Sequence, residues 1–500
     1  MSSRPLAGPT RRQWIVLVCL FLLSLPAVTP RLYSSDEIQY FAYLRSLWFD
    51  RDLSFENEYR HFYDLGIAKS EGFRETFLEM KTDTGRRINF GTIGCAILWS
   101  PFYAVGDLVA RATGAPVDGF SKPYIAAVAY ASAVYGFLSL LLALACTRRL
   151  GLKGFGAVLA IWFGTPLLFY MYVAPPFSHA TSAFSVALFV YTWLRVRDTW
   201  SPRGAAALGA VGALMTMVRE QDAFFVFGPM LDFLVLEGRP GWRLVVGGMV
   251  GRGPRRLKAG AWKPVLAAAA AFTITFTPQA AAYIVLNGHL GPHASVGHKM
   301  NWMGVHSVQV LFSPEHGYFV WTPLALIAIA GLFALARQPT PDDLRAGGDE
   351  EPIEPAWGPL RRRMTAVPRG NELIASCLIV MVALQIYIGG SVESWTVAGG
   401  FGQRRFVALT SILVIGLAAA ARALAPSPVA VRRAGAAIIA LAVYWNVALT
   451  AAFSIGLMDR QKLEPRRNAY DAFVTLPRMA PDLIYRYLFD RASFYQRHER

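Results

Sequence analysis

The sequence predicts an all-α polytopic membrane protein, and three observations support this fold class. Hydrophobic residues make up 54% of the 500 residues and charged residues only 16%, whereas a soluble domain carries about 25% charged residues. The apolar residues gather in long blocks, several of which reach the roughly 20 residues that a helix needs to cross a bilayer. Basic residues concentrate between these blocks. Together these features exclude disordered, collagen-like and disulfide-scaffold classes and argue against a soluble fold.

About eleven of the apolar blocks are expected to span the membrane, with twelve or thirteen spans as the alternative. The first block follows a short basic segment. We interpret it as an uncleaved span rather than a signal peptide, because a functional motif follows it closely. The expected spans are residues 14–30, 123–146, 154–172, 179–196, 204–221, 223–236, 264–286, 318–336, 371–389, 404–421 and 434–456.

The charge of the connecting loops predicts the orientation of the spans. Basic residues hold cytoplasmic loops on their side of the membrane. With the N-terminus inside, the basic clusters around Arg148, within 237–263 and around Arg432 all fall on the inner side. Residues 31–122 then lie outside. We therefore expect a multi-pass protein of the cytoplasmic (inner) membrane whose functional motifs face the periplasm or exterior.

Residues 89–110 are long enough to be a further span. Counting them as one would turn the Arg148 loop outward and break the charge pattern. Gly91, Gly94, Pro101 and Asp107 also weaken a simple lipid-facing helix in this segment. We expect a juxtamembrane or re-entrant piece on the outer side.

The chain is expected to form one membrane domain and a short tail. The domain covers residues 1–456 and includes the first outer loop, 31–122, and a cytoplasmic linker at 337–370 that is rich in proline, glycine and charge. The tail, 457–500, is polar with interspersed aromatic residues and is expected on the outer side as a small helical cap.

Neither the net charge nor the cysteines and histidines indicate binding of nucleic acid, metal or a cofactor. The net charge of +16 is explained by the membrane loops, so nucleic-acid binding is not expected. The four cysteines have neither disulfide nor zinc spacing. Five histidines fall in 287–317, but nearby glycines and Pro292 argue against the helix that His289 and His293 would need to share a metal. We expect no metal and no cofactor.

The first outer loop carries the most informative pattern. Asp36 and Glu37 are followed by apolar residues at helical spacing, which are Ile38, Phe41, Leu44, Leu47 and Trp48. Such a helix is expected to lie on the membrane surface. It would hold the two carboxylates just above the outer end of the first span.

The run Asp36-Glu37-x-x-Tyr40, with Arg45 nine residues after the aspartate, resembles the opening of this loop in a known family. The family is the GT-C glycosyltransferases, in particular the family 39-type group of protein O-mannosyltransferases and aminoarabinose transferases. The resemblance implies a GT-C fold with juxtamembrane helices in the first outer loop. It also implies an enzyme that takes a sugar from a polyprenyl phosphate outside the cytoplasmic membrane.

A second match lies downstream, where Arg86-Arg87-x-Asn89 leads into an apolar segment and resembles the family's continuation. The resemblance covers the first 200 residues or so in pattern and the rest in the layout of spans. It implies that these three residues, with Tyr40 and Arg45, contact the substrates.

The chemistry gives an independent reason for these residue types. An acceptor hydroxyl is a poor nucleophile, so a positioned carboxylate must take its proton. Asp36 is the predicted base of an inverting displacement, and Glu37 is predicted to orient the acceptor or the sugar. The lipid phosphate that leaves develops negative charge, which suits the planar fork of arginine. The outer-side candidate cations are Arg86, Arg87, Arg219, Lys299, Arg404 and Arg405.

Each candidate also has a structural interpretation. Asp36 and Glu37 could cap a helix, because acids favour helix N-termini. Arg404 and Arg405 could be anchors that reach the interface. Arg219 could pair with the acids that directly follow it.

The predicted function is transfer of a monosaccharide from a polyprenyl-phosphate donor to a glycan, lipid or protein acceptor. The expected partners are these substrates and the surrounding membrane lipids. The alternative is a secondary transporter or lipid flippase, although the internal repeats typical of transporters are not evident. A third hypothesis is a non-catalytic assembly partner that keeps the fold. The sugar, the acceptor and the oligomeric state stay open.

Overall fold

The computed structural model describes residues 11–239, 243–246, 249–252, 256–257, 260–338 and 370–494. Helices predominate among them. The strands form two short antiparallel pairs, which are β1 (Gly238–Arg239) with β4 (Arg256–Leu257) and β2 (Arg243–Val246) with β3 (Met249–Arg252). Most of the linker expected at 337–370 lies outside the described residues.

Five helical segments in the described part of the chain are long and apolar enough to cross a membrane. They are α6 (Lys122–Arg149), α12 (Trp262–Asn287), α19 (Asn371–Ser391), η6 with α20 (Arg404–Leu424) and α21 (Val429–Ser454). Three shorter apolar helices are α7 (Phe155–Gly164), α10 (Pro202–Val218) and α16 (Pro323–Ala336). The all-α membrane class is therefore supported, whereas the count of eleven spans is not confirmed.

Prolines divide two of the expected spans. The segment expected at 154–172 forms α7 and α8 (Leu167–Tyr172), with Pro166 between them. The segment expected at 318–336 forms α15 (Tyr318–Trp321) and α16, with Pro323 in the first turn of α16. Proline lacks a backbone N–H and clashes with the preceding turn, so it is tolerated better at the start of a helix than in its interior.

The remaining elements are shorter or less apolar. Those in the bundle are α1 (Arg11–Ser24), η1 (Leu25–Ala27), α9 (His179–Val196), η4 (Glu220–Val226) and α11 (Phe227–Glu237). Those of the loops and tail are α13 (Ala294–His298), α14 (Ser307–Phe312), η5 (Val397–Gly399), α22 (Pro465–Tyr470), η7 (Asp471–Thr475), α23 (Leu476–Phe489) and η8 (Arg491–Phe494).

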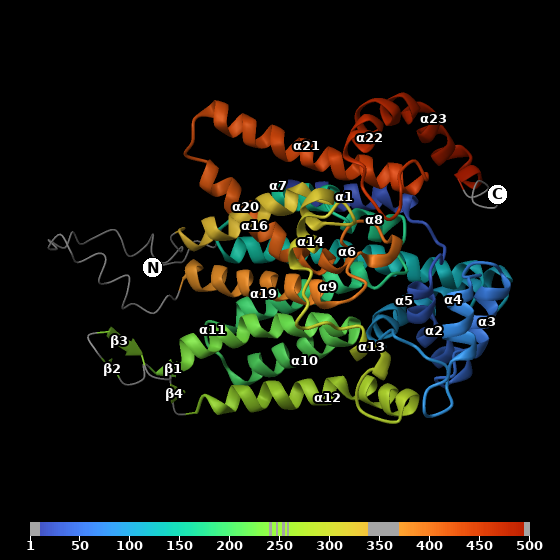
Figure 1. The fold of residues 1–500 in the computed structure, drawn as a ribbon, viewed down its shortest axis with the longest axis horizontal. Helices are drawn as coiled ribbons and strands as arrows, with labels where there is room; N and C mark the ends of the chain where they lie inside the picture. The colour runs from blue at the N-terminus through green and yellow to red at the C-terminus, as the bar shows by residue number, and fades with distance from the viewer. Residues whose placement is uncertain are drawn as a thin grey trace.

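The long helices run side by side along the longest axis of the molecule (Figure 1). The strand pairs lie at one end of this bundle, at the left of the view. The first loop and the C-terminal helices α22 and α23 lie at the other end. This arrangement agrees with the predicted separation of residues 31–122 and the tail from the basic loop at 237–263. We call the end that carries the first loop the outer end.

Small residues allow the helices to approach closely. A Cβ atom added to Gly331 of α16 would lie 1.9 Å from the carbonyl oxygen of Gly416 of α20. A Cβ atom on Gly209 of α10 would lie 2.1 Å from the carbonyl oxygen of Ala268 of α12. Close approach through glycine is the usual way for membrane helices to gain packing contacts.

The outer end has its own apolar core, separate from that of the bundle. Its elements are α2 (Ser35–Arg45), η2 (Ser46–Asp50), α3 (Glu56–Asp64), α4 (Glu71–Phe73), η3 (Arg74–Glu79) and α5 (Gly94–Thr113). The segment expected to be juxtamembrane, 89–110, becomes mostly α5. This helix lies with the first-loop helices (Figure 1) and is not among the five candidate spans.

The helix predicted after Asp36 is present as α2, but the prediction that its apolar face lies on the membrane surface is wrong. Ile38, Phe41 and Leu44 are buried in the outer core, and only Leu47 and Trp48, beyond the helix, are exposed. Helical spacing shows that one face is apolar but not whether lipid or protein covers it. Protein packing therefore fixes the helix that carries the acidic pair.

Candidate active site

The cavity that contains half of the ten predicted catalytic and substrate-binding residues lies where the outer end meets the bundle. Its volume is about 540 Å³, and its walls come from α2, the 90–92 segment, the start of α9, η4, the 292–302 loop and η6. Its charged lining residues are Asp36, Arg219, Glu220, Lys299, Arg404 and Arg405. The polar side chains of Gln39, Tyr40, His179, Gln221 and Ser394 also line it.

Asp36 lies in the first turn of α2 and faces the cavity. Its Oδ2 atom forms an ion pair with Nη1 of Arg404 at 2.9 Å, and its side chain is 41% exposed. Arg404 is held from the other side by the Phe177 ring, 5.4 Å from the guanidinium carbon to the ring centroid. The carboxylate is thus oriented by a fixed cation and still reachable from the cavity.

Arg405 and Arg219 are held by neutral groups. Arg405 donates to the carbonyl and hydroxyl oxygens of Ser394 at 2.9 and 3.2 Å. Arg219 contacts the His179 ring and donates to Oε1 of Gln221 at 3.0 Å. Gln221 in turn donates to the carbonyl oxygen of Arg405 at 3.4 Å, so the two arginine segments are linked. Neutral partners fix a guanidinium without neutralising its charge.

Among the described residues, neither of the acids that follow Arg219 forms an ion pair with it. Asp222 is buried and accepts a hydrogen bond from the Ser182 hydroxyl at 2.6 Å. Glu220 accepts one from the Tyr283 hydroxyl. The interpretation that Arg219 pairs with the acids directly after it is therefore not supported, because the hydrogen-bond partners of Arg219 are neutral.

Lys299 lies on the opposite loop, with its Nζ atom 4.4 Å from the centroid of the Phe90 ring. The backbone of this loop is fixed to the end of α19. The Glu393 amide donates to the Lys299 carbonyl at 2.9 Å, and Met300 pairs with Val392 in an antiparallel bridge. The position of the lysine is therefore set by backbone contacts, although its side chain is exposed.

Tyr40 lines the cavity one turn after Asp36. Burial raises the pKa of its phenol to about 12, although the nearby Arg219 opposes that shift. The phenol is therefore neutral at physiological pH and can donate a hydrogen bond. Its place in the cavity is compatible with the predicted contact to substrate.

Glu37 does not reach the cavity, so the predicted role of orienting the acceptor or sugar lacks a geometric basis. Its side chain is fully buried, and Oε2 accepts from the amides of Tyr33 and Ser34. This is a capping box, in which the third helical residue satisfies backbone donors before the helix. Burial raises the pKa of Glu37 to about 8, more than the two backbone hydrogen bonds lower it.

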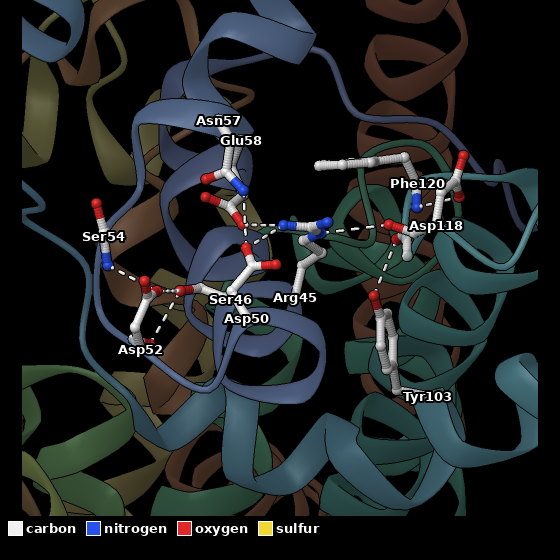
Figure 2. A network of polar contacts seen from close by, with 11 residues as sticks. Arg45, Ser46, Asp50, Asp52, Ser54, Asn57, Glu58, Tyr103, Asp118 and Phe120 are labelled. Atoms are coloured by element: carbon white, nitrogen blue, oxygen red, sulfur yellow. Dashed lines mark hydrogen bonds and ion pairs between the residues drawn. The ribbon is translucent and has the colours of Figure 1, made fainter.

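Arg45 also lies away from the cavity. It forms ion pairs with Asp50 and, at 3.0 Å, with Glu58, and it donates to the Asp118 carbonyl at 3.3 Å. Its guanidinium lies 4.5 Å from the centroid of the Phe120 ring. Figure 2 shows these groups gathered around the guanidinium from three separate segments. The structure therefore gives Arg45 a packing role within the outer end rather than the predicted substrate contact.

The second motif also supports the outer end rather than lining the cavity. Arg86 donates to the Leu53 carbonyl at 3.1 Å, and Arg87 forms an ion pair with Glu56 at 3.1 Å. Asn89 is buried and donates to the Gln39 carbonyl at 3.0 Å, and its Oδ1 accepts from the Gly91 amide at 2.7 Å. Asn89 thus joins two walls of the cavity, whereas neither arginine is among its lining residues.

Several site residues were not predicted from the sequence. His179, Gln221 and Ser394 each hold an arginine of the cavity. They lie in short polar stretches at the ends of apolar segments, where such residues are common, and their spacing carries no motif. Only the interruption of the apolar run at Arg219 pointed to this wall.

The histidines of 287–317 have separate surroundings. His316 is buried and stacks on Trp321 at 4.7 Å, and His306 stacks on Trp395 at 5.7 Å. His293 bonds to Ser295. In the part of the chain that the structure describes, no three histidine, cysteine or carboxylate side chains are grouped as metal ligands would be.

No protein-family model and no curated protein matches this chain.

Proposed function

We propose that the chain is an integral membrane glycosyltransferase that moves a monosaccharide from a polyprenyl-phosphate donor to a lipid, glycan or protein acceptor. The observation that carries the proposal is the shared cavity of one exposed carboxylate, Asp36, and a set of cations held mainly by neutral partners. The resemblance of the Asp36 segment to GT-C enzymes supports the same reaction. The proposal needs both groups, because transfer requires a base at the acceptor and positive charge at the leaving phosphate.

In the proposed mechanism, the acceptor hydroxyl donates its proton to Asp36 as its oxygen attacks the anomeric carbon. The bond from that carbon to the phosphate oxygen breaks, and the phosphate leaves with the electron pair. The configuration at the anomeric carbon inverts. Arg219 and Arg405 stabilise the departing phosphate through charge-assisted hydrogen bonds. Arg404 orients Asp36 through their ion pair until the carboxylate receives the proton.

Replacing Asp36 tests the base directly. Asp36→Asn keeps the shape of the side chain but removes the basic oxygen, so transfer from a synthetic polyprenyl-phosphate sugar should fall by about 10²–10⁴-fold. Asp83→Asn is the matched control, because Asp83 is an exposed carboxylate of the same loop that does not line the cavity. The measurement is radiolabelled sugar transferred to extracted lipid and protein, at matched expression.

Near wild-type transfer by Asp36→Asn would remove Asp36 as the base. A wild-type protein that moves the donor lipid across a bilayer without transferring its sugar would instead support the flippase alternative.

The proposal places the cavity on the outer face of the cytoplasmic membrane. Cysteines introduced at Ser70 and Ser493, both at the outer end, should then react with an impermeant thiol reagent in intact, outer-membrane-permeabilised cells. A cysteine at Ala425, an exposed position in the loop between α20 and α21, should be protected. The background is Cys19→Ser, because Cys19 is the exposed native cysteine among the described residues. Protection of both outer sites would reverse the orientation.

A further inference from the structure

The charge of the cavity exceeds what a simple lipid-phosphate sugar requires. Four cations and two carboxylates line it. A polyprenyl-phosphate sugar is a phosphodiester and carries a single negative charge. By formal charge, the lining has two more positive groups than negative ones, so one positive charge remains unbalanced when such a donor is bound. A second negative charge on the donor would balance the charge of the lining.

The partners of the cations show which charges are uncompensated. Arg404 is paired with Asp36. Arg405 and Arg219 have neutral partners, and they are joined through Gln221 into one wall that suits a phosphate. Lys299 has no recorded ion pair in the described chain. It lies on a different loop, over an aromatic ring.

The surroundings of Lys299 suit a sugar rather than a second phosphate. The Phe90 ring and the Tyr40 phenol line the same cavity, and Gln39, which also lines it, accepts from the Phe90 amide and so fixes this wall. Aromatic rings and hydrogen-bonding side chains are the groups that hold a pyranose. The two phosphates of a pyrophosphate are adjacent, so the linked pair of arginines would bind both, whereas Lys299 is carried by a separate loop.

From this arrangement we infer that the transferred sugar is acidic, a hexuronate, and that Lys299 binds its carboxylate. The inference rests on the proposed function and names its donor class. The sugar ring lies between the two cationic groups, with its anomeric carbon towards the arginines and Asp36. A neutral sugar would leave the lysine without a partner in the bound state.

Binding of three synthetic donors to the full-length protein in nanodiscs tests the inference. The donors share one polyprenyl chain and are the phospho-galacturonate, the phospho-galactose and the pyrophospho-galactose. The wild-type protein should bind the galacturonate donor about tenfold or more tightly than the galactose donor, as expected for one charge-assisted contact. Lys299→Met should bring this ratio of dissociation constants close to one. Lys462→Met, a change at an exposed lysine of the tail, should leave the ratio as it is.

Each other outcome overturns the inference in a recognisable way. Equal binding of the galacturonate and galactose donors would show that the sugar is not read by its charge. Preference for the pyrophosphate donor would show that the second negative charge of the donor lies on the leaving group and not on the sugar. Failure to bind any of the three would remove the donor class itself, and with it the proposed function. Because these readouts need no transfer, a wrong assignment of Asp36 as base would not affect them.

Discussion

The two ends of α2 carry ionic groups with different surroundings. At the N-terminal end, Asp36 is 41% exposed, and its recorded ion pair is with Arg404 of a distant segment. At the C-terminal end, Arg45 pairs with Asp50 and with Glu58, whose side chain has no exposed surface. The first group faces a cavity, and the second is enclosed by three segments of the outer end (Figure 2).

This difference separates a group available to a ligand from a group used to hold the fold. The Arg45 guanidinium already has two carboxylates, a carbonyl and an aromatic ring as partners. A substrate would have to displace them. Arg219 and Arg405, on the cavity wall near Asp36, instead have neutral partners, which orient them and leave their charge uncompensated. Partner type, rather than the presence of charge, distinguishes the two ends.

The largest effect is expected at the structural end. Arg45→Ala leaves Glu58 buried without its cation, which should lower the free energy of unfolding by about 3–5 kcal/mol. The apparent melting temperature in detergent should fall accordingly, and transfer should decline with the folded fraction. Adding Glu58→Gln to this variant should recover part of the loss, because the buried charge is then gone.

The matched control for this prediction is Arg60→Ala. Arg60 is exposed and pairs with Glu56 one turn away, and such surface pairs contribute about 0–1 kcal/mol. A melting temperature for Arg45→Ala equal to that of Arg60→Ala would contradict the structural role. Loss of transfer at an unchanged melting temperature would return Arg45 to the substrate site.

A smaller effect, on kinetics rather than folding, is expected at the phosphate wall. Arg405→Ala removes a phosphate contact and should raise KM for the donor or lower kcat. Arg404→Ala removes the cation that orients Asp36 and should lower kcat. Losing one charge-assisted contact amounts to about 1.5–3 kcal/mol, which is about tenfold or more in kcat/KM. Arg432→Ala, an exposed arginine near the start of α21, is the control. Unchanged kinetics for both cavity variants would leave Arg219 as the phosphate contact and weaken the distinction between the two ends.

The sequence could predict the helix and its acidic first turn, because both are local. The helical spacing and the two acids at the start of the helix are both read within one short segment. The separation of the two ends of α2 could not be predicted. It depends on Arg404, 368 residues after Asp36, and on Asp118, 73 residues after Arg45. Contacts between such distant positions cannot be predicted from a single sequence. The motif spacing therefore assigned both Asp36 and Arg45 to the substrate site.

The burial of α2 was missed for a related reason. An apolar face at Ile38, Phe41 and Leu44 is equally suited to lipid and to a protein core. The core that covers it includes residues of α3 and α5 and of the bundle helices α6, α10 and α12, which are far apart in the sequence. The sequence also treated Asp36 and Glu37 as one acidic pair, although successive residues on a helix point about 100° apart.

The contrast between the exposed Asp36 and the buried Glu37 leads to the smallest predicted effect on transfer. Glu37→Gln preserves an oxygen that can accept from the Tyr33 and Ser34 amides and should lower transfer far less than Asp36→Asn.

The main effect of Glu37→Gln should appear in the pH dependence of stability. Burial raises the pKa of Glu37 to about 8 from 4.5, so the native state binds a proton that the unfolded state releases over this range. The wild-type protein therefore loses stability from this group as the pH rises from about 4.5 to about 8. Glutamine does not titrate, so the melting temperature of Glu37→Gln relative to wild type should rise by about 2 °C or more between pH 5 and pH 9. A difference that stays constant over this range would show that Glu37 is ionised in the native state, and its burial as a neutral cap would then be wrong.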